Sequence, residues 1–200
     1  MRASPNHEPA ACALGNDAQT ALRLSVGDLV VYACHGIGRI ESREHHGASG
    51  ELLVLVFESG LKVMLPLERA QNALRALSGE PELEEVQRTL GGDSPPVALE
   101  HWSRGHRNAQ AKLAGGSIGG LAEIVRDGAH RERARLKGGT APIRNQLYRT
   151  ARRLLIAEVA AARGIEPDAA DAWIGLQIEG DPLAARRARR APRAEARANR

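Results

Sequence analysis

The spacing of apolar positions divides the chain into a strand-rich part and a helical part. Residues 26–67 hold short runs of Val, Ile and Leu separated by glycine-containing turns. Runs of this length and composition, bounded by glycine, predict β-strands. We expect four or five short strands here, forming a small and strongly bent sheet or a partly open barrel close to the size limit for independent folding.

Two turns predict how the first strands pair. One pair is expected to meet at a tight turn around His35 and Gly36, where glycine allows a positive φ. Residues 51–58 and 61–65 flank a short glycine-containing connection of hairpin type. Pro66 is expected to end the following strand because proline has no N–H to donate to a neighbour.

Beyond residue 67 the apolar residues recur at intervals of three and four, which is typical of amphipathic helices. The pattern predicts helices over 68–77, 81–90, 97–114, from an N-cap at Ser117 onward, from 140 to Gly164, and over 167–178. The helix that starts near residue 140 is expected to be the longest, and Trp173 in the last helix is expected to be part of a core. The sequence therefore predicts an α+β protein, a small sheet or barrel followed by an all-helical bundle.

The chain is expected to contain two domains and two disordered ends. Residues 25–74 would form the β domain and residues 78–180 the helical domain. Residues 1–24 show no sustained period, and residues 181–200 are rich in arginine and alanine. Both ends are expected to be disordered because they lack the apolar residues that a core needs.

Composition narrows the class of protein. Hydrophobic residues make up 42% of the chain and aromatic residues only 2%, so the cores must be aliphatic. The two cysteines, Cys12 and Cys34, form no CxxC motif, which argues against a disulfide framework or a structural zinc site and favours a reducing compartment. We find no apolar run of membrane-spanning length. The expected location is the cytoplasm.

The net charge of +4 conceals a strong asymmetry along the sequence. Residues 1–100 hold 8 Lys and Arg against 14 Asp and Glu, whereas residues 101–153 hold 12 against 3. Residues 154–180 are acidic again, and the last twenty residues carry seven arginines and two acids. A basic stretch between acidic flanks is typical of a protein that contacts a phosphate backbone, although a charged run can equally be a solvated face.

Support for catalysis or a cofactor is thin. His35, His45 and His46 stand close in sequence, with Cys34 adjacent, but they lack the spacing of a helical zinc motif. No nucleophile-elbow, Walker or dinucleotide-binding motif is present. We therefore predict a protein that is not an enzyme and needs neither a metal nor another cofactor; a small metal-dependent hydrolase is the weaker alternative.

Trp102 begins a predicted helix that also carries arginines. An indole among cations suits a nucleic-acid contact. It could equally pack the helix against the break at Pro95-Pro96, a common role for a single tryptophan. The residues alone leave both interpretations open.

A resemblance to a known family is carried by the block VGDLVVYACHGIGRIE and by the hairpin that ends in KVMLPLERA. Both resemble the RNA-polymerase-interacting domain of the CarD/CdnL family of bacterial transcription regulators, a domain that also occurs in transcription-repair coupling factor. The family's helical segment, which begins with W-S-R-R and passes through K-[LI]-x-[ST]-G to [AV]-E-V-[VL]-R-D-L, is similar to HWSRGHRNAQAKLAGGSIGGLAEIVRDG. Its penultimate helix is similar to LYRTARRLLIAEVAAARG. The resemblance covers roughly Ser25 to Gly180.

The resemblance implies that the first domain is a Tudor-like, five-stranded β-barrel that docks on the β subunit of RNA polymerase. The matching edge and loop positions are His46, Met64 and Pro66. Some family members carry arginine where His46 or Met64 align. Docking is therefore expected to be less cationic and more apolar in this chain.

The resemblance further implies that the helical domain lies at the upstream edge of the melted promoter. There the family's tryptophan wedges into the minor groove without reading sequence, and basic neighbours hold phosphates. The matching positions are Trp102, Arg104, Arg107 and Lys112. Gly105 stands where the family usually has arginine, and Gly128 where it usually has leucine.

The resulting hypothesis is a monomeric, nucleoid-associated transcription regulator that binds RNA polymerase and stabilises the open promoter complex. The alternative is a polymerase-binding paralogue whose helical domain is a protein-interaction scaffold without DNA contact. Gly105 and the glycine-rich helix after Ser117 favour the alternative modestly.

Overall fold

The computed structural model describes five stretches of the chain and one isolated residue. These are residues 24–33, 35–45, 47, 50–92, 102–138 and 146–180. For residues 102–104 and 134–138 it describes the backbone alone. The two ends that were expected to be disordered lie outside the described residues, apart from Leu24.

The N-terminal part is an antiparallel sheet of five strands with one short helix. The strands are β1 (Leu29–Tyr32), β2 (Gly36–His45), β3 (Glu51–Phe57), β4 (Lys62–Pro66) and β5 (Leu74–Ala76), and α1 (Leu67–Ala73) joins the last two. Their order in the sheet is β4-β3-β2-β1-β5. The predicted turns are confirmed, and Gly36 adopts a positive φ of 87°.

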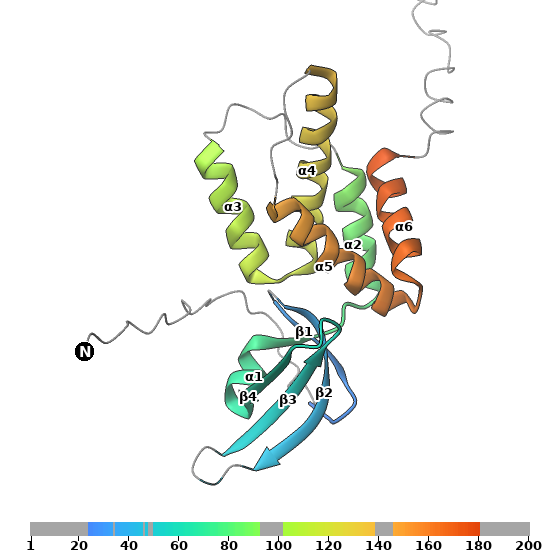
Figure 1. Ribbon diagram of the computed structural model, residues 1–200. Coiled ribbons are helices and arrows are strands. Elements are labelled where there is room, and N and C mark those ends of the chain that lie inside the picture. Colours follow the sequence, from blue (N-terminus) through green and yellow to red (C-terminus); the bar gives the residue numbers. More distant parts are fainter. Residues whose placement is uncertain are drawn as a thin grey trace, which may run out of the picture.

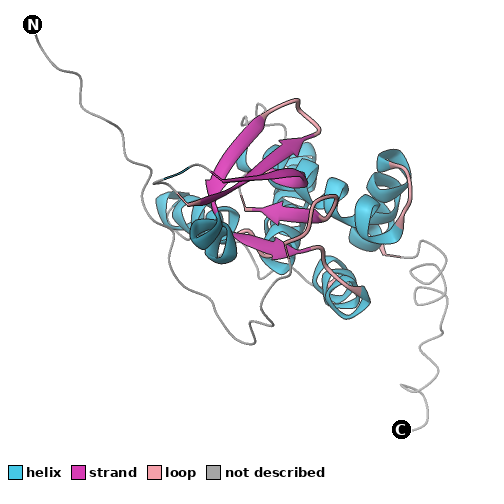
Figure 2. Cartoon of the chain, turned by 90° about the horizontal axis from the view of Figure 1, so that it is seen from below, coloured by secondary structure: helices cyan, strands magenta, loops and turns pink. Residues whose placement is uncertain are grey.

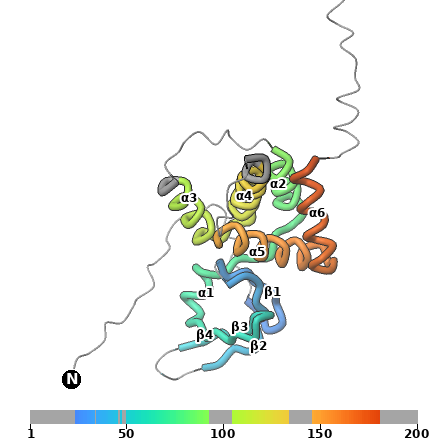
Figure 3. Tube along the Cα trace, turned by 45° about the horizontal axis from the view of Figure 1, so that its top comes forward, coloured from blue at the N-terminus to red at the C-terminus, as the bar shows by residue number. Residues whose placement is uncertain are grey.

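The sheet curls around its own core, as expected (Figure 3). A register shift between Ile40 and Ser42 marks a bulge in β2, and such irregularities bend a strand. Residues on the inner side of the strands are buried with Ala70 of α1, which lies against β3, β4 and β5. This core contains Leu24, Val30, Ile40, Leu53, Leu55, Phe57, Leu65, Ala70 and Leu74.

One predicted element is wrong in its second half. A helix was expected over 68–77, but α1 ends at Ala73 and residues 74–76 form β5, which pairs with β1. Leu74 is buried in the core of the sheet. Tertiary pairing therefore overrides the helical spacing of this short segment.

The C-terminal part is a bundle of helices above the sheet (Figure 1). Its helices are α2 (Glu80–Gly91), α3 (Trp102–Gly115), α4 (Ile118–Gly138), α5 (Gln146–Arg163) and α6 (Pro167–Glu179). α4 packs against α2 and α5, and α6 packs against the same two helices. α3 contacts α4 and α5 and stands at one side of the bundle.

In the bundle, the helix boundaries agree with the sequence pattern where both can be compared. Ser117 caps α4 as predicted, because its Oγ accepts a hydrogen bond of 3.1 Å from the N–H of Gly120. The expected beginnings at 97–101 and 140–145 lie outside the described residues. Within the described part the longest helix is α4, with 21 residues against 18 in α5.

The bundle has an aliphatic core of its own, to which Trp173 adds at the edge. Trp173 is half-buried against this core, and the guanidinium of Arg163 lies 4.2 Å from the centre of its ring. The prediction that Trp173 packs into the core is thus confirmed in part, since one side of the indole meets a cation.

The sheet and the helical bundle contact each other at α5 and at the turn between α3 and α4. α5 crosses the top of the sheet, and the start of β2 contacts it there (Figures 1 and 2). Gly36 approaches α5 so closely that a Cβ on it would lie 3.0 Å from Leu154. Gly116, between α3 and α4, approaches Ala33 even more closely, since a Cβ there would lie 2.6 Å from the Ala33 Cβ.

Candidate functional site

The outer side of β3 and β4 carries an exposed apolar surface. Leu65 of β4 points into the core, so Met64 and Pro66 on either side of it point outward, and Met64 is 51% exposed. On β3 their partners are Val54 and Leu52. Val54 is only 6% exposed, yet it is not part of the core cluster of the sheet. These four residues, Leu52, Val54, Met64 and Pro66, form what we call the outer apolar face.

The outer apolar face lies at an edge of the sheet and has a charged rim. β4 is an edge strand, paired within the sheet with β3 alone. Lys62 on β4 binds Glu41 on β2 at 2.7 Å, and Ser42 and Glu44 of β2 stand opposite Val54 and Leu52. An apolar centre with a polar rim is the usual make-up of a protein–protein contact surface. His46 lies outside the described residues, so it is not placed with Met64 and Pro66.

The basic residues of α3 lie on more than one face of that helix. Trp102 is its first residue, and the side chains of Trp102 and Arg104 lie outside the described part. By the helical period, position 102 falls on the same face as Ala109 and Leu113, which pack against the bundle core. Arg104 and Arg107 are three residues apart and share another face, where Arg107 is exposed. Position 102 is therefore at the N-terminal end of the inward seam of α3, on roughly the opposite side of the helix from the arginines.

Lys112 forms an ion pair within the bundle. Its ammonium binds the carboxylate of Glu123 on α4, and both side chains are about two-fifths exposed. A phosphate would have to compete with this carboxylate, so Lys112 is a poorer phosphate ligand than its position in the sequence suggests. The prediction that it contacts DNA remains untested.

Several other cations of residues 101–153 also have partners inside the bundle. Arg126 binds Asp127 and the carbonyl of Thr89, and Arg133 binds Glu179. Arg152 binds Asp171 at 2.7 Å and donates to the Tyr148 hydroxyl at 3.0 Å. Burial lowers the pKa of Arg152, but Tyr148 and Asp171 outweigh burial and raise its pKa above the ordinary value. At least four of the twelve cations in this stretch therefore pair with acids of the bundle.

The structure also exposes two arginines that the sequence analysis did not single out. Arg149 and Arg153 lie one turn apart on the outward side of α5. The amphipathic spacing of LYRTARRLLIAEV could have identified them, because the buried Ala151, Leu154 and Leu155 place these two arginines on the opposite face. They are further candidates for phosphate contacts.

The histidines considered as metal ligands are separated by the length of a strand. His35 precedes β2 and packs beside the rings of Tyr32 and Phe57, at centroid distances of 5.0 and 5.7 Å. His45 ends β2, and a ten-residue strand spans about 30 Å. Within the described stretches no three His, Cys, Asp or Glu side chains gather as a metal site would require. Cys34 and His46 fall outside those stretches.

Two family models match the chain, one over each half of the fold. Residues 24–78 match the model of the CarD-like/TRCF RID domain, and residues 85–175 match that of the CarD C-terminal domain. The first match covers the sheet with α1, and the second runs from within α2 to within α6. The chain belongs to the CarD family. The resemblance noted in the sequence is thereby confirmed, as is the predicted fold class.

Membership in the CarD family defines the broad function of the chain. Its two domains are those of a transcription factor that interacts with RNA polymerase and are not of an enzymatic kind. The described helices of this CarD family chain include none with the length and apolar character needed to span a membrane.

Proposed function

We propose that the protein binds the β subunit of RNA polymerase through the outer apolar face and stabilises the open promoter complex through α3. The observation that carries the first half is Met64, half exposed at the centre of an apolar surface on an edge strand. An exposed large apolar side chain on an edge strand is favourable for docking another protein. Pro66 extends this surface, and His46 would border it.

The second half of the proposal concerns α3. Trp102 would insert into the minor groove at the upstream edge of the bubble, while Arg104 and Arg107 hold phosphates. Inserting a wedge costs a few kcal/mol of unstacking per base step, so it is favoured where the duplex is already distorted. Such a contact needs no base recognition. Lys112 would join the phosphate contacts if DNA displaces Glu123.

The two contacts would depend on each other. Three or four phosphate contacts imply a log–log salt slope near −3, at roughly 0.9 per phosphate, which is weak DNA binding. Attachment to polymerase would raise the local concentration of α3 at the promoter and make that weak contact effective.

The decisive experiment replaces the indole. Trp102→Ala should retain polymerase binding but lose most of the effect on open-complex lifetime, measured by competitor challenge of promoter complexes. Arg88→Ala on α2 is a suitable control, because Arg88 is an exposed arginine that pairs within its own helix. An unchanged lifetime with Trp102→Ala would refute the wedge.

A second candidate function is favoured by the ion pairs of the bundle. Because Lys112, Arg126, Arg133 and Arg152 are engaged with protein acids, the helical domain could be a protein-interaction scaffold without DNA contact. Gel shifts on forked and intact duplex DNA separate the two candidates. A scaffold should show no preference for the fork, whereas the wedge should bind the fork more tightly.

A further inference from the structure

A buried carboxylate lies at the junction between the sheet and the bundle. Glu158 of α5 is only 1% exposed, and among the described residues it is the charged residue that is buried. A carboxylate at such a site is stable only when it is paired and hydrogen-bonded.

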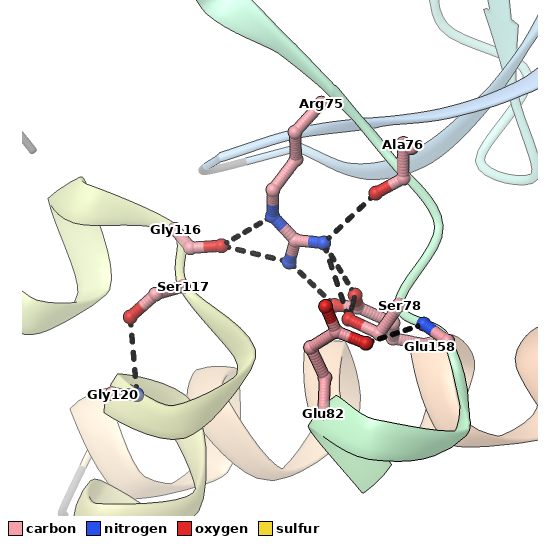
Figure 4. Close-up of polar contacts among 9 residues, drawn as sticks. Arg75, Ala76, Ser78, Glu82, Gly116, Ser117, Gly120 and Glu158 are labelled. Atoms are coloured by element: carbon pink, nitrogen blue, oxygen red, sulfur yellow. Dashed lines mark hydrogen bonds and ion pairs between the residues drawn. The ribbon is translucent and has the colours of Figure 1, made fainter. Parts of the chain in front are cut away.

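Its partner comes from the other half of the fold. Arg75 of β5 donates from Nη1 to Oε1 of Glu158 at 2.5 Å and from Nη2 to Oε2 at 2.7 Å (Figure 4). Ser78, in the connection between β5 and α2, donates to Oε1 at 2.6 Å. The carboxylate thus accepts a bidentate contact from the guanidinium and a hydrogen bond from the hydroxyl. A bidentate contact fixes the relative orientation of the two side chains as well as their distance.

The same guanidinium also holds the turn that ends α3. Arg75 donates from Nε and Nη2 to the carbonyl oxygen of Gly116, at 3.0 and 2.8 Å (Figure 4). Gly116 follows α3 directly and is packed against Ala33 of the sheet. One side chain therefore joins β5, α5 and the α3–α4 turn.

We propose that Arg75 and Glu158 are positioning residues that fix the direction of α3 relative to the outer apolar face. This inference rests on the proposed function, because α3 would contact DNA while the sheet is bound to polymerase. Apolar junctions permit small sliding motions, and domains joined by modest interfaces move relative to each other by default. A planar guanidinium fork shared between a carboxylate and a carbonyl restricts that motion.

Two variants of the full-length chain test the Arg75–Glu158 pair. Glu158→Gln keeps the shape but removes the charge. Arg75→Lys keeps the charge but lacks the fork that reaches Gly116 and Glu158 together. Glu85→Gln is the matched control, since it removes a carboxylate that pairs with an arginine at 2.5 Å within α2 alone.

The first measurement is the distance between the two halves. Spin labels on a ketone-bearing unnatural amino acid at Ser59, in the exposed β3–β4 turn, and at Gln110, on the exposed side of α3, leave the native cysteines untouched. The distance distribution should become about two-fold wider in Glu158→Gln and Arg75→Lys, as expected for released domains, and stay unchanged in Glu85→Gln. Circular dichroism checks that each variant keeps its helix content.

The second measurement joins position to function. Glu158→Gln and Arg75→Lys should both bind polymerase like the wild type, because the outer apolar face is intact. They should lose most of the effect on open-complex lifetime. Unchanged distance distributions in both variants would overturn the proposal, as would wider distributions with a full lifetime effect. If the wild-type chain has no effect on open-complex lifetime, the proposed function is refuted instead. The label distances would still decide whether Arg75 and Glu158 fix the sheet relative to the bundle.

Discussion

At the scale of single residues, the structure gives a reason for a departure from the family pattern. Gly128 stands where the family usually has leucine, and the ring of Tyr148 from α5 occupies the space beside it. A Cβ built on Gly128 would lie 2.3 Å from Cδ2 of that ring. Glycine in a helix is unfavourable by itself. At position 128 it leaves room for the Tyr148 ring, and packing of this ring offsets the unfavourable helix propensity.

Gly128→Ala should therefore destabilise the protein although alanine favours helices. Overpacking of this kind costs about 1–3 kcal/mol, which exceeds the roughly 1 kcal/mol gained in helix propensity. Gly175→Ala in α6 is the control, because nothing lies within 4 Å of its Cβ. Urea unfolding should show a lower midpoint for Gly128→Ala and a higher one for Gly175→Ala. Equal and higher midpoints in both would show that Tyr148 moves aside without cost.

Met64 gives the residue-scale test of polymerase docking. Met64→Glu places a charge in the outer apolar face and should weaken binding to the isolated polymerase β-subunit lobe by about 2 kcal/mol or more, the size of a central contact. Leu176→Glu is matched to it, because Leu176 is 57% exposed on α6, away from the sheet. Calorimetry should show weaker binding for Met64→Glu alone. Equal losses, or none, would count against the outer apolar face.

At the scale of elements, local pattern predicted most of the fold. Alternation and glycine turns predicted β1 to β4, and three-and-four spacing predicted α2 and α6 almost to the residue. β5 was missed because three residues carry too little pattern to oppose the helix-like spacing before them. Its strand character comes from pairing with β1, which lies about forty residues earlier in the chain.

α3 shows where charge patterning alone is insufficient. Lys112 looks in sequence like the other cations of this stretch, but α4 supplies Glu123 beside it, and no spacing rule connects Lys112 with Glu123. The sequence could predict a basic helix. Which of its cations meet acids within the bundle depends on the packing of α4 beside it.

Gly105→Arg tests whether α3 contacts DNA at all. Nothing lies within 4 Å of a Cβ at this position, so an arginine fits, and the family usually has one there. The added charge should steepen the log–log salt slope of fork-DNA binding by about 0.9, the value for one phosphate. Gln87→Arg, exposed on α2, adds the same charge elsewhere and should leave the slope unchanged. The scaffold function predicts equal slopes for both variants.

At the scale of the whole molecule, the contacts that join the two halves were beyond sequence reasoning. Arg75 and Glu158 are 83 residues apart, and each lies in a segment whose own pattern is complete without the other. Glu158 interrupts the apolar spine of α5, which is a signal that a charge must be satisfied nearby. The sequence does not identify Arg75 as the partner of Glu158, because this contact forms only through the packing of the folded chain.

The glycine at the end of α3 offers a test of the junction that leaves the ion pair intact. Gly116 and Gly164 each follow a helix with nearly the same φ, 65° and 62°. Alanine in this left-handed conformation costs about 1–2 kcal/mol at either position. They differ in surroundings, because Gly116 is buried against Ala33 whereas nothing lies within 4 Å of a Cβ on Gly164.

Gly164→Ala should therefore lose only the conformational cost, while Gly116→Ala should lose about 1–3 kcal/mol more from the forced separation of α3 from the sheet. Because the added cost falls on the junction, Gly116→Ala should also widen the distance distribution between labels at positions 59 and 110, which Gly164→Ala should not. Urea unfolding and the label distances together distinguish strain within a helix end from strain between the two halves. If both variants unfold at the same midpoint with narrow distances, the contact of Gly116 with Ala33 does not hold α3 against the sheet, and the orientation would rest on Arg75 and Glu158 alone.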